Sequence, residues 1–275
     1  MSEAITVKNL KKYYGSGIRS RAIAALDGAT FSVESGEIFG LLGANGAGKS
    51  TAIKIITGLI RQSSGECLVF GQKLSRAARA QMGYLPESPY FYRFLTGFEL
   101  TVFYAKLCGM KTAEAKAAAM RALNTVGLDD AADRRLALYS KGMTQRAGLA
   151  QAIVHNPRLL VLDEPASGLD PVGADDLCNI ILRLKGEGKT ILLSSHIMGE
   201  IEKLCDRIAI MSRGSVAAAG RTSELLEIKG GYELSFSSES PGRVLEAAES
   251  AGAKGAKLSP AKIKLDEFFR SIARK

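Results

Sequence analysis

The chain has few of the features that mark secreted, zinc-binding or membrane-spanning proteins. Its four cysteines among 275 residues have no CxxC spacing, which argues against a zinc site or a disulfide framework and favours reduced thiols packed as small apolar groups. No stretch approaches the roughly 18 uninterrupted apolar residues of a membrane span, and the first residues carry no basic-then-apolar export signal. We therefore expect a cytosolic protein. The cysteines are Cys67, Cys108, Cys178 and Cys205.

The chain also has no long block of like charges, although its balance is basic. The net charge is +9 at neutral pH, which suits an acidic partner such as a nucleotide, a nucleic acid or an anionic membrane face. The excess lies mostly in the first half and is dispersed, which favours a generally solvated basic surface. No specific nucleic acid is expected as a partner. An apolar content of 46% is ample for a buried core.

Short apolar runs predict strands in the first third of the chain. The alternating residues 29–33 and the continuous run 38–42 are typical of a half-buried and a fully buried strand, respectively. Three further strands are expected, at residues 5–7, 66–70 and 82–85.

The middle of the chain changes character and predicts an all-helical insertion, at about residues 88–155. Thr96 and Thr112 are candidate N-caps, and Gly127 is a natural C-terminal stop. Alternation of strand and helix then resumes, which implies a mostly parallel sheet covered on both faces. The expected later strands are 159–162, 190–193 and 207–211, around helices at 171–185 and 197–205.

Past Gly220 the pattern weakens and suggests a small appendage. A short helix is expected at 223–228, a break at Gly230 and Gly231, a strand at 232–236 and a terminal helix at 265–273. We place the boundary between the main domain, 1-228, and the appendage, 229-275, at this change.

The most informative motif is a glycine-rich run that fits the pattern GxxxxGK[ST], from Gly43 to Ser50. It lies between the buried run 38–42 and a helical segment, so its backbone N–H groups can surround a polyphosphate at a helix N-terminus. Lys49 would reach the β- and γ-phosphates, and Ser50 would offer a hydroxyl to Mg²⁺. The simpler alternative is a glycine turn without a ligand.

A second motif brings two carboxylates to the end of a buried strand. The apolar run 159–162 is followed by Asp163 and Glu164. Parallel strands deliver such residues to the carboxyl edge of the sheet, where Asp163 can hold the Mg²⁺ water shell opposite Ser50. Glu164 is then placed to orient and deprotonate a water that attacks the γ-phosphate. An acidic pair before Pro165 at a helix start is the structural alternative.

The run from Tyr139 to Arg146, with sequence YSKGMTQR, resembles the Leu-Ser-Gly-Gly-Gln signature of ATP-binding cassette (ABC) transporters. The chain looks like their nucleotide-binding subunit over roughly residues 3–228. This resemblance implies an α/β fold with a P-loop NTPase core, a mostly parallel sheet, an antiparallel β subdomain, the helical insertion and a small C-terminal α+β appendage. The Ser-Lys-Gly-Met form is similar to the branch that serves separately encoded exporter permeases (ABC-2 type).

The resemblance also implies a composite site. In the family the signature of one subunit closes on the γ-phosphate held by the other, so two ATP molecules lie in a head-to-tail dimer. Ser140 and Gly142 would then face the partner's nucleotide, and Lys141, which departs from the usual glycine, would add a positive charge there. Within one subunit, the loop residues that would hold ATP are Gly43, Asn45, Gly46, Gly48, Lys49, Ser50 and Thr51.

Further residues match family motifs less closely. The segment Ser167–Asp170 resembles the loop through which two subunits communicate, and His196 matches the switch histidine that contacts the γ-phosphate. Tyr14 stands where an aromatic stacks on adenine and is favoured for this role over the adjacent Tyr13, although either tyrosine could belong to the core instead. Glu87 stands where glutamine is usual; it could still ligate Mg²⁺, with a stronger dependence on pH and metal, or be a surface acid.

Four aromatics lie within Tyr90–Phe94, in a chain that is only 7% aromatic. In the family, this joint between catalytic core and helical insertion is where a membrane partner docks, and aromatics are favoured at interfaces. Ordinary core packing explains the cluster as well. The residues are Tyr90, Phe91, Tyr92 and Phe94.

The sequence therefore predicts an Mg²⁺-dependent ATPase that dimerises, as a homodimer or with a paralogous cassette, and drives an integral membrane permease, with export as the expected direction. It would be cytoplasmic and peripheral on the inner face of the cell membrane through the permease. One alternative is a soluble cassette ATPase acting on ribosomes or DNA. Another is a kinase or GTPase, which would leave the signature and His196 unexplained.

Overall fold

The computed structural model describes residues 2–15, 23–226 and 241–252. The chain divides into two compact units, Met1–Leu225 and Leu226–Lys275. The second unit contains helix α9 (Pro241–Ser250). The first contains the sheets and the candidate site, and the description below concerns that unit. Among the described residues, no helix combines the length and the apolar character needed to cross a bilayer.

The first unit is built on a six-stranded sheet with the order β10-β9-β3-β8-β7-β6. All neighbouring strands in it run parallel except the edge strand β10, which pairs antiparallel with β9. The residues of β3 are all buried, as expected for a strand covered on both faces. The strands are β3 (Ile38–Leu42), β6 (Met82–Leu85), β7 (Leu159–Leu162), β8 (Thr190–Ser195), β9 (Arg207–Ser212) and β10 (Ser215–Arg221).

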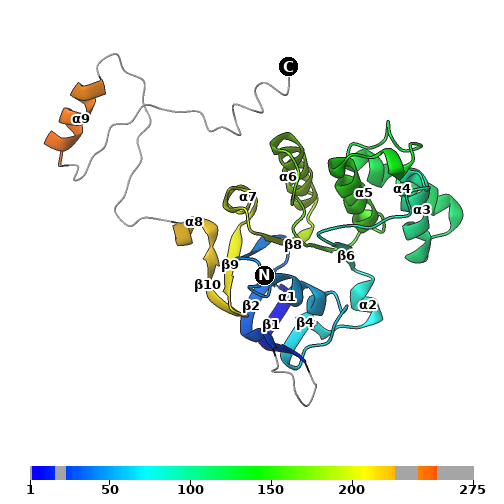
Figure 1. The fold of residues 1–275 in the computed structure, drawn as a ribbon, viewed down its shortest axis with the longest axis horizontal. Helices are drawn as coiled ribbons and strands as arrows, with labels where there is room; N and C mark the ends of the chain where they lie inside the picture. The colour runs from blue at the N-terminus through cyan, green and yellow to red at the C-terminus, as the bar shows by residue number, and fades with distance from the viewer. Residues whose placement is uncertain (1, 16–22, 227–240, 253–275) are drawn as a thin grey trace. The chain divides into compact units, whose positions relative to one another are not determined.

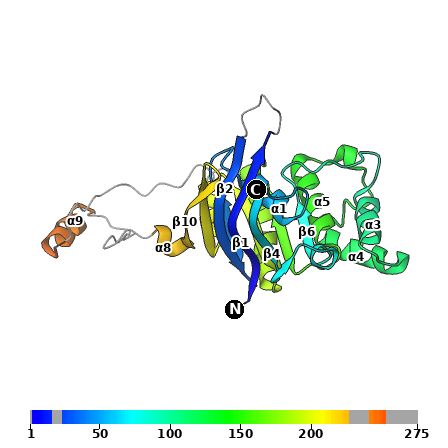
Figure 2. The ribbon, with the colours of Figure 1, turned by 90° about the horizontal axis from the view of Figure 1, so that it is seen from below.

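A second, antiparallel sheet has the order β2-β1-β4-β5. Its long strands β1, β2 and β4 lie side by side in Figure 2. The strands are β1 (Glu3–Tyr14), β2 (Ile23–Glu34), β4 (Ser64–Val69) and β5 (Gln72–Lys73). The mostly parallel sheet and the antiparallel subdomain agree with the expected fold class.

Alternation along the central strands creates two hydrophobic cores. Ile38 and Leu42 belong to a core shared with the helical segment, whereas Phe39 and Leu41 belong to a core shared with α1 and the antiparallel sheet. Successive side chains of a strand point to opposite faces, so a single buried strand supplies both cores. Phe39 stacks on Phe31 of β2, with ring centroids 5.7 Å apart, which ties the two sheets together.

Every named element between β6 and β7 is a helix, and α3, α4 and α5 gather there in Figure 1. Thr96 caps α3 through a capping box with Glu99, and Gly127 ends α4 with a φ of 65°. The helices that begin in the first unit are α1 (Lys49–Ile56), α2 (Arg76–Arg79), α3 (Gly97–Leu107), α4 (Thr112–Thr125), η1 (Leu136–Leu138), α5 (Lys141–Ile153), α6 (Pro171–Gly186), α7 (Met198–Leu204) and α8 (Thr222–Leu226).

The expected elements of the first 226 residues are present, with local differences. Thr112 is the first residue of α4 rather than its cap; Lys111 holds the cap position without a side-chain bond. Cys108 is exposed, so the prediction that all cysteines pack inside was wrong for it. Strand β10 and the short α2 were not expected, nor was α9. The strand and helix expected at 232–236 and 265–273 lie outside the described residues.

Candidate nucleotide-binding and hydrolysis site

The glycine-rich loop joins the end of β3 to the start of α1. Gly48 stands at the N-cap of α1 with a φ of 108°, a conformation that L side chains rarely adopt. A β-carbon on Gly48 would lie 2.7 Å from the Ala25 carbonyl oxygen, and one on Gly43 would lie 2.5 Å from that of Met211. Because both neighbours are backbone atoms that cannot move aside, glycine is required at these two positions.

The loop borders a cavity of about 680 Å³, large enough for a nucleotide. Its walls come from the start of β2, the loop and α1, and the ends of β6, β7 and β8. The candidate site residues that line it are Asn45, Gly46, Gly48, Lys49, Ser50, Thr51, Glu87, Glu164 and His196.

Lys49 and His196 both contact the Glu164 carboxylate. The Lys49 ammonium lies 3.1 Å from Glu164 Oε1, and the side chains of the pair are only 5% and 7% exposed. Lys49 also donates a hydrogen bond to the Gly43 carbonyl, at 2.7 Å. His196 Nδ1 lies 2.7 Å from Glu164 Oε2. Lys49, His196 and Glu164, the three residues predicted to act on the γ-phosphate, are therefore in direct contact through the Glu164 carboxylate.

Glu164 also has an unusual backbone. Its φ is +47°, in the left-handed region that a glutamate seldom occupies. Such a conformation costs on the order of 1–3 kcal/mol and persists where surrounding contacts impose it. Here the Glu164 N–H donates to Ser194 Oγ at 2.9 Å, which holds the strained residue against β8.

Asp163 is buried and shares Ser194 with its neighbour. Ser194 Oγ donates to Asp163 Oδ1 at 2.6 Å, and Ser50 Oγ donates to the same oxygen at 3.2 Å. The parallel register pairs Leu162 with Leu193, so the residue after each comes to the same edge of the sheet. Ser194 belongs to the site although the sequence assigned it no role. The sequence feature that could have pointed to Ser194 is its hydroxyl, next to the end of a buried strand.

Ser195 and Glu200 form a second support that the sequence did not indicate. Ser195 Oγ donates to Glu200 Oε2 at 3.1 Å and accepts from the Ile197 N–H at 3.0 Å, which braces the turn that carries His196. Burial raises the pKa of Glu200, and the nearby Glu164 raises it further.

The oxygen donors of the site fit Mg²⁺. Ser50 and Asp163 are in contact, and Glu87 lines the same cavity. Hydroxyl and carboxylate oxygens are the ligands that this hard cation prefers, and the cavity leaves room for the waters that it retains. The Lys49 ammonium and the loop N–H groups suit the phosphates.

Five of the predicted residues do not line the cavity: Gly43 and Asp163, whose contacts are given above, and the three residues Tyr14, Ser140 and Gly142. Tyr14 is 42% exposed, and the Lys12 ammonium lies over the Tyr14 ring, 5.2 Å from the ring centroid. Its cross-strand neighbour Ile23 does line the cavity. Ser140 caps α5 by accepting the Met143 N–H at 3.2 Å. The third, Gly142, follows it on the first turn of that helix.

The chain is similar to ABC transporter proteins along most of its length. The family model described as ABC transporter matches residues 26–167. An uncharacterized ABC transporter ATP-binding protein from Nostoc sp. is 43% identical over 84% of this chain and 70% of its own. The linearmycin resistance ATP-binding protein LnrL of Bacillus subtilis is 36% identical over 82% and 72% of the two chains. The lantibiotic transport ATP-binding protein SrtF of Streptococcus pyogenes is 37% identical over 77% and 88%.

Solved structures of similar fold also come from ABC transporters. An ATP-binding subunit of an ABC transporter has a TM-score of 0.70 at 30% identity, covering 98% of this chain and 99% of its own. A dimeric bacterial ABC transporter cassette has a TM-score of 0.72 at 25% identity, covering 79% and 98%. The relatives from Nostoc and Streptococcus pyogenes and both structures are named for transport, which supports transport over the alternative of action on ribosomes or DNA. By sequence, fold and site, the chain belongs to the ABC transporter family and is the ATP-binding, ATP-hydrolysing subunit of such a transporter.

Proposed function

We propose that Lys49 and the Gly43–Thr51 loop bind the phosphates of ATP, with Ser50, Asp163 and Glu87 around Mg²⁺. The metal would neutralise charge on the phosphates. The observation that carries the proposal is the Glu164 carboxylate held between Lys49 and His196. Phosphate oxygens compete with this carboxylate for the Lys49 ammonium. When Lys49 turns to the phosphates, Glu164 is free to accept a proton from the attacking water.

In this proposal His196 has two duties. Its bond to Glu164 keeps the carboxylate pointed into the cavity, and its ring contacts the γ-phosphate. Ser194 holds Asp163 and the Glu164 backbone in fixed relation, so the metal ligand and the base are positioned together. Tyr14 would stack on the adenine from the rim, next to Ile23.

We further propose that the site is completed by a second subunit. Ser140 and Gly142 lie outside the cavity of their own chain, and a β-carbon on Gly142 would meet nothing closer than Leu169, at 3.9 Å. This open backbone at the start of α5 can receive a phosphate from a partner at a helix N-terminus. A solved cassette of similar fold is dimeric. Either a homodimer or a paralogous cassette dimer satisfies the geometry.

Lys141 gives this chain's version of the signature an extra positive charge. Its ammonium lies over Gly168, so close that a β-carbon on Gly168 would overlap it. Lys141 thus bridges the start of α5 and the loop Ser167–Asp170, two segments proposed to face the partner. Asp170 meanwhile caps α6 by accepting the Gly173 N–H at 2.8 Å.

The membrane partner is proposed to dock at the aromatic segment. Tyr90 is 92% exposed, and Tyr92 and Phe94 are largely exposed, whereas Phe91 packs against the core beside the helical insertion. An exposed group of aromatics is typical of an interface. The partner would be an integral membrane permease that places the subunit on the inner face of the cell membrane. Export is supported by relatives named for linearmycin resistance and lantibiotic transport.

We propose domain limits of 1-228 for the ATPase and 229-275 for the appendage. The division of the chain into compact units at Leu225 and Leu226 supports a boundary in this region. The family match, which ends at 167, covers the loop, the helical insertion and the two carboxylates.

The role of Glu164 is tested by Glu164→Gln. Because a general base contributes about 10²- to 10⁴-fold, we expect the ATP hydrolysis rate to fall at least ~100-fold. ATP binding should persist or tighten, since Lys49 no longer has a carboxylate competing for it. Steady-state hydrolysis and equilibrium ATP binding measure the two effects. Glu202→Gln, at an exposed position of α7, is the control, and a rate for Glu164→Gln within threefold of that control would contradict the assignment.

The charge of Lys141 is tested in the Glu164→Gln background, where ATP stays bound. Lys141→Gly should weaken ATP-driven dimerisation, by about 3- to 10-fold for one partly solvated charge. Lys141→Gln keeps much of the side-chain stem and removes the charge, so an equal loss in both variants identifies the charge as the cause. Analytical ultracentrifugation with ATP measures the dimer. Dimerisation unchanged by either substitution argues against a contact with the partner's nucleotide.

Tyr90 and Phe91 form a matched pair for the docking surface. Tyr90→Ala should weaken permease binding at least ~10-fold, the size of an interface hot spot, and leave ATP hydrolysis by the isolated subunit unchanged. Phe91→Ala should lower the thermal stability of the subunit, because it leaves space in the core. Co-purification with the permease and thermal unfolding separate the two. If Tyr90→Ala reduces stability and hydrolysis together, the docking role fails.

A further inference from the structure

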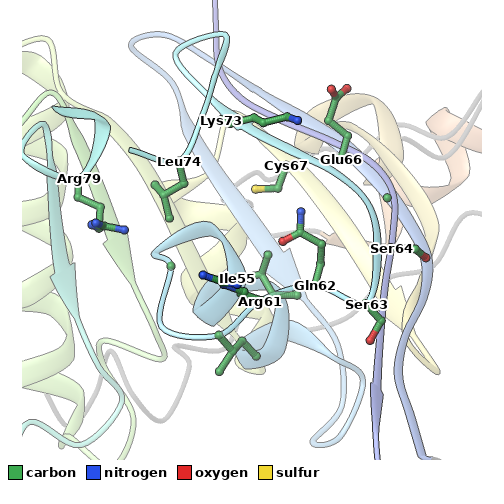
Figure 3. A pocket seen from close by; sticks show the side chains of 13 residues that line it. Ile55, Arg61, Gln62, Ser63, Ser64, Glu66, Cys67, Lys73, Leu74 and Arg79 are labelled. Atoms are coloured by element: carbon green, nitrogen blue, oxygen red, sulfur yellow. The ribbon is translucent and has the colours of Figure 1, made fainter. Parts of the chain in front are cut away.

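A second cavity, of about 650 Å³, lies at the other end of α1 from the nucleotide site. It is bordered by the C-terminal end of α1 and the loop after it, by β4 and β5, and by α2 (Figure 3). It shares no lining residue with the nucleotide cavity, and neither the hydrolysis chemistry nor the proposed dimer uses it.

Three cationic side chains from separate segments surround this cavity. Arg61 comes from the loop after α1, Lys73 from β5 and Arg79 from α2, and Figure 3 shows the three side chains apart from one another among the lining residues. Within the part of the chain that the structure describes, none of the three belongs to an ion pair. Glu66 is the single carboxylate on the wall, so the lining carries a net positive charge.

The position of Arg61 is supported by the fold. Its carbonyl oxygen accepts a hydrogen bond from the Lys12 ammonium at 2.7 Å, and the Ser63 hydroxyl accepts the Tyr13 N–H at 3.1 Å. Both bonds fasten the loop after α1 to strand β1. The loop therefore presents Arg61 from a defined backbone.

Part of the cavity wall is apolar. Ile55 and Cys67 are buried there, and Leu74 lies beside them. Burial raises the pKa of the Cys67 thiol to about 11, so it stays neutral at physiological pH. Positive groups together with apolar residues on one wall suit an organic molecule that carries anionic oxygens at one end.

We propose that this cavity is a second anion site, which binds a phosphate-bearing ligand through Arg61, Lys73 and Arg79. A guanidinium pairs with two phosphate oxygens at once, and an ammonium acts as a third point charge. A phosphate carries more anionic oxygens than a carboxylate, which suits a wall that presents several cationic side chains. The phosphate can belong to a small soluble molecule or to a lipid headgroup, and the two sources make the same contacts here.

The test compares two variants that lose the same charge. The site variant is Arg61→Gln/Lys73→Gln/Arg79→Gln, and the control is Lys54→Gln/Arg76→Gln/Lys106→Gln, at exposed positions outside the wall. The nucleotide site of the full chain is first saturated with ADP. Calorimetry then measures binding of inorganic pyrophosphate, and sedimentation measures binding to phosphatidylcholine vesicles with and without phosphatidylglycerol.

We expect the unchanged protein and the control variant to bind at least one probe, and the site variant to bind it at least ~10-fold more weakly. Binding of pyrophosphate but not of the phosphatidylglycerol vesicles would identify a small soluble ligand. Binding of those vesicles but not of pyrophosphate would identify a lipid headgroup. The proposal is overturned if neither probe binds, or if both variants weaken binding equally, which is a general effect of charge. Equal melting temperatures of the two variants exclude misfolding. ATP hydrolysis is measured in parallel, so a failure here leaves the proposed function unaffected.

Discussion

One buried carboxylate organises the centre of this protein. Glu164 accepts Lys49 on one oxygen and His196 on the other, in a place where an unpaired charge could not be held. Removing one member of such a buried pair costs about 3–5 kcal/mol, because the other is left without compensation. A ligand that takes Lys49 away must therefore bring its own negative charge, and the phosphates of ATP do so. The same contact that stabilises the site without nucleotide thus makes it selective for a polyanion.

The pairing register of the parallel strands places the residues around Glu164 next to one another. Strands β3, β8 and β7 are neighbours, and their carboxyl ends bring the glycine loop, Ser194 and Asp163 to one edge of the sheet. Each strand feeds two cores by alternation, so sliding one strand by a single residue would misplace the site and exchange the cores. The positive φ of Glu164 is the local cost of turning the base into the cavity.

Much of this could be predicted because the signals were local. The buried runs 38–42 and 159–162 became β3 and β7 with the expected bounds, Thr96 caps the start of α3, and Gly127 ends α4, as their chemistry predicts. What could not be predicted depends on tertiary placement. Ser194 gains its role from the strand beside it, and Phe91 and Tyr90 face opposite environments although they are adjacent in sequence. The cavity of Arg61, Lys73 and Arg79 unites three segments whose proximity no sequence period encodes.

The most direct measurement is an experimental structure of the Glu164→Gln protein and of the unchanged protein with Mg²⁺ and a non-hydrolysable ATP analogue. The account predicts that in the unchanged protein Lys49 Nζ contacts a phosphate oxygen and lies beyond 4.0 Å from Glu164 Oε1, in place of the present 3.1 Å. It also predicts that, where two copies form the dimer, Ser140 of one reaches the γ-phosphate held by the other. A Lys49–Glu164 contact that persists beside bound nucleotide would contradict it.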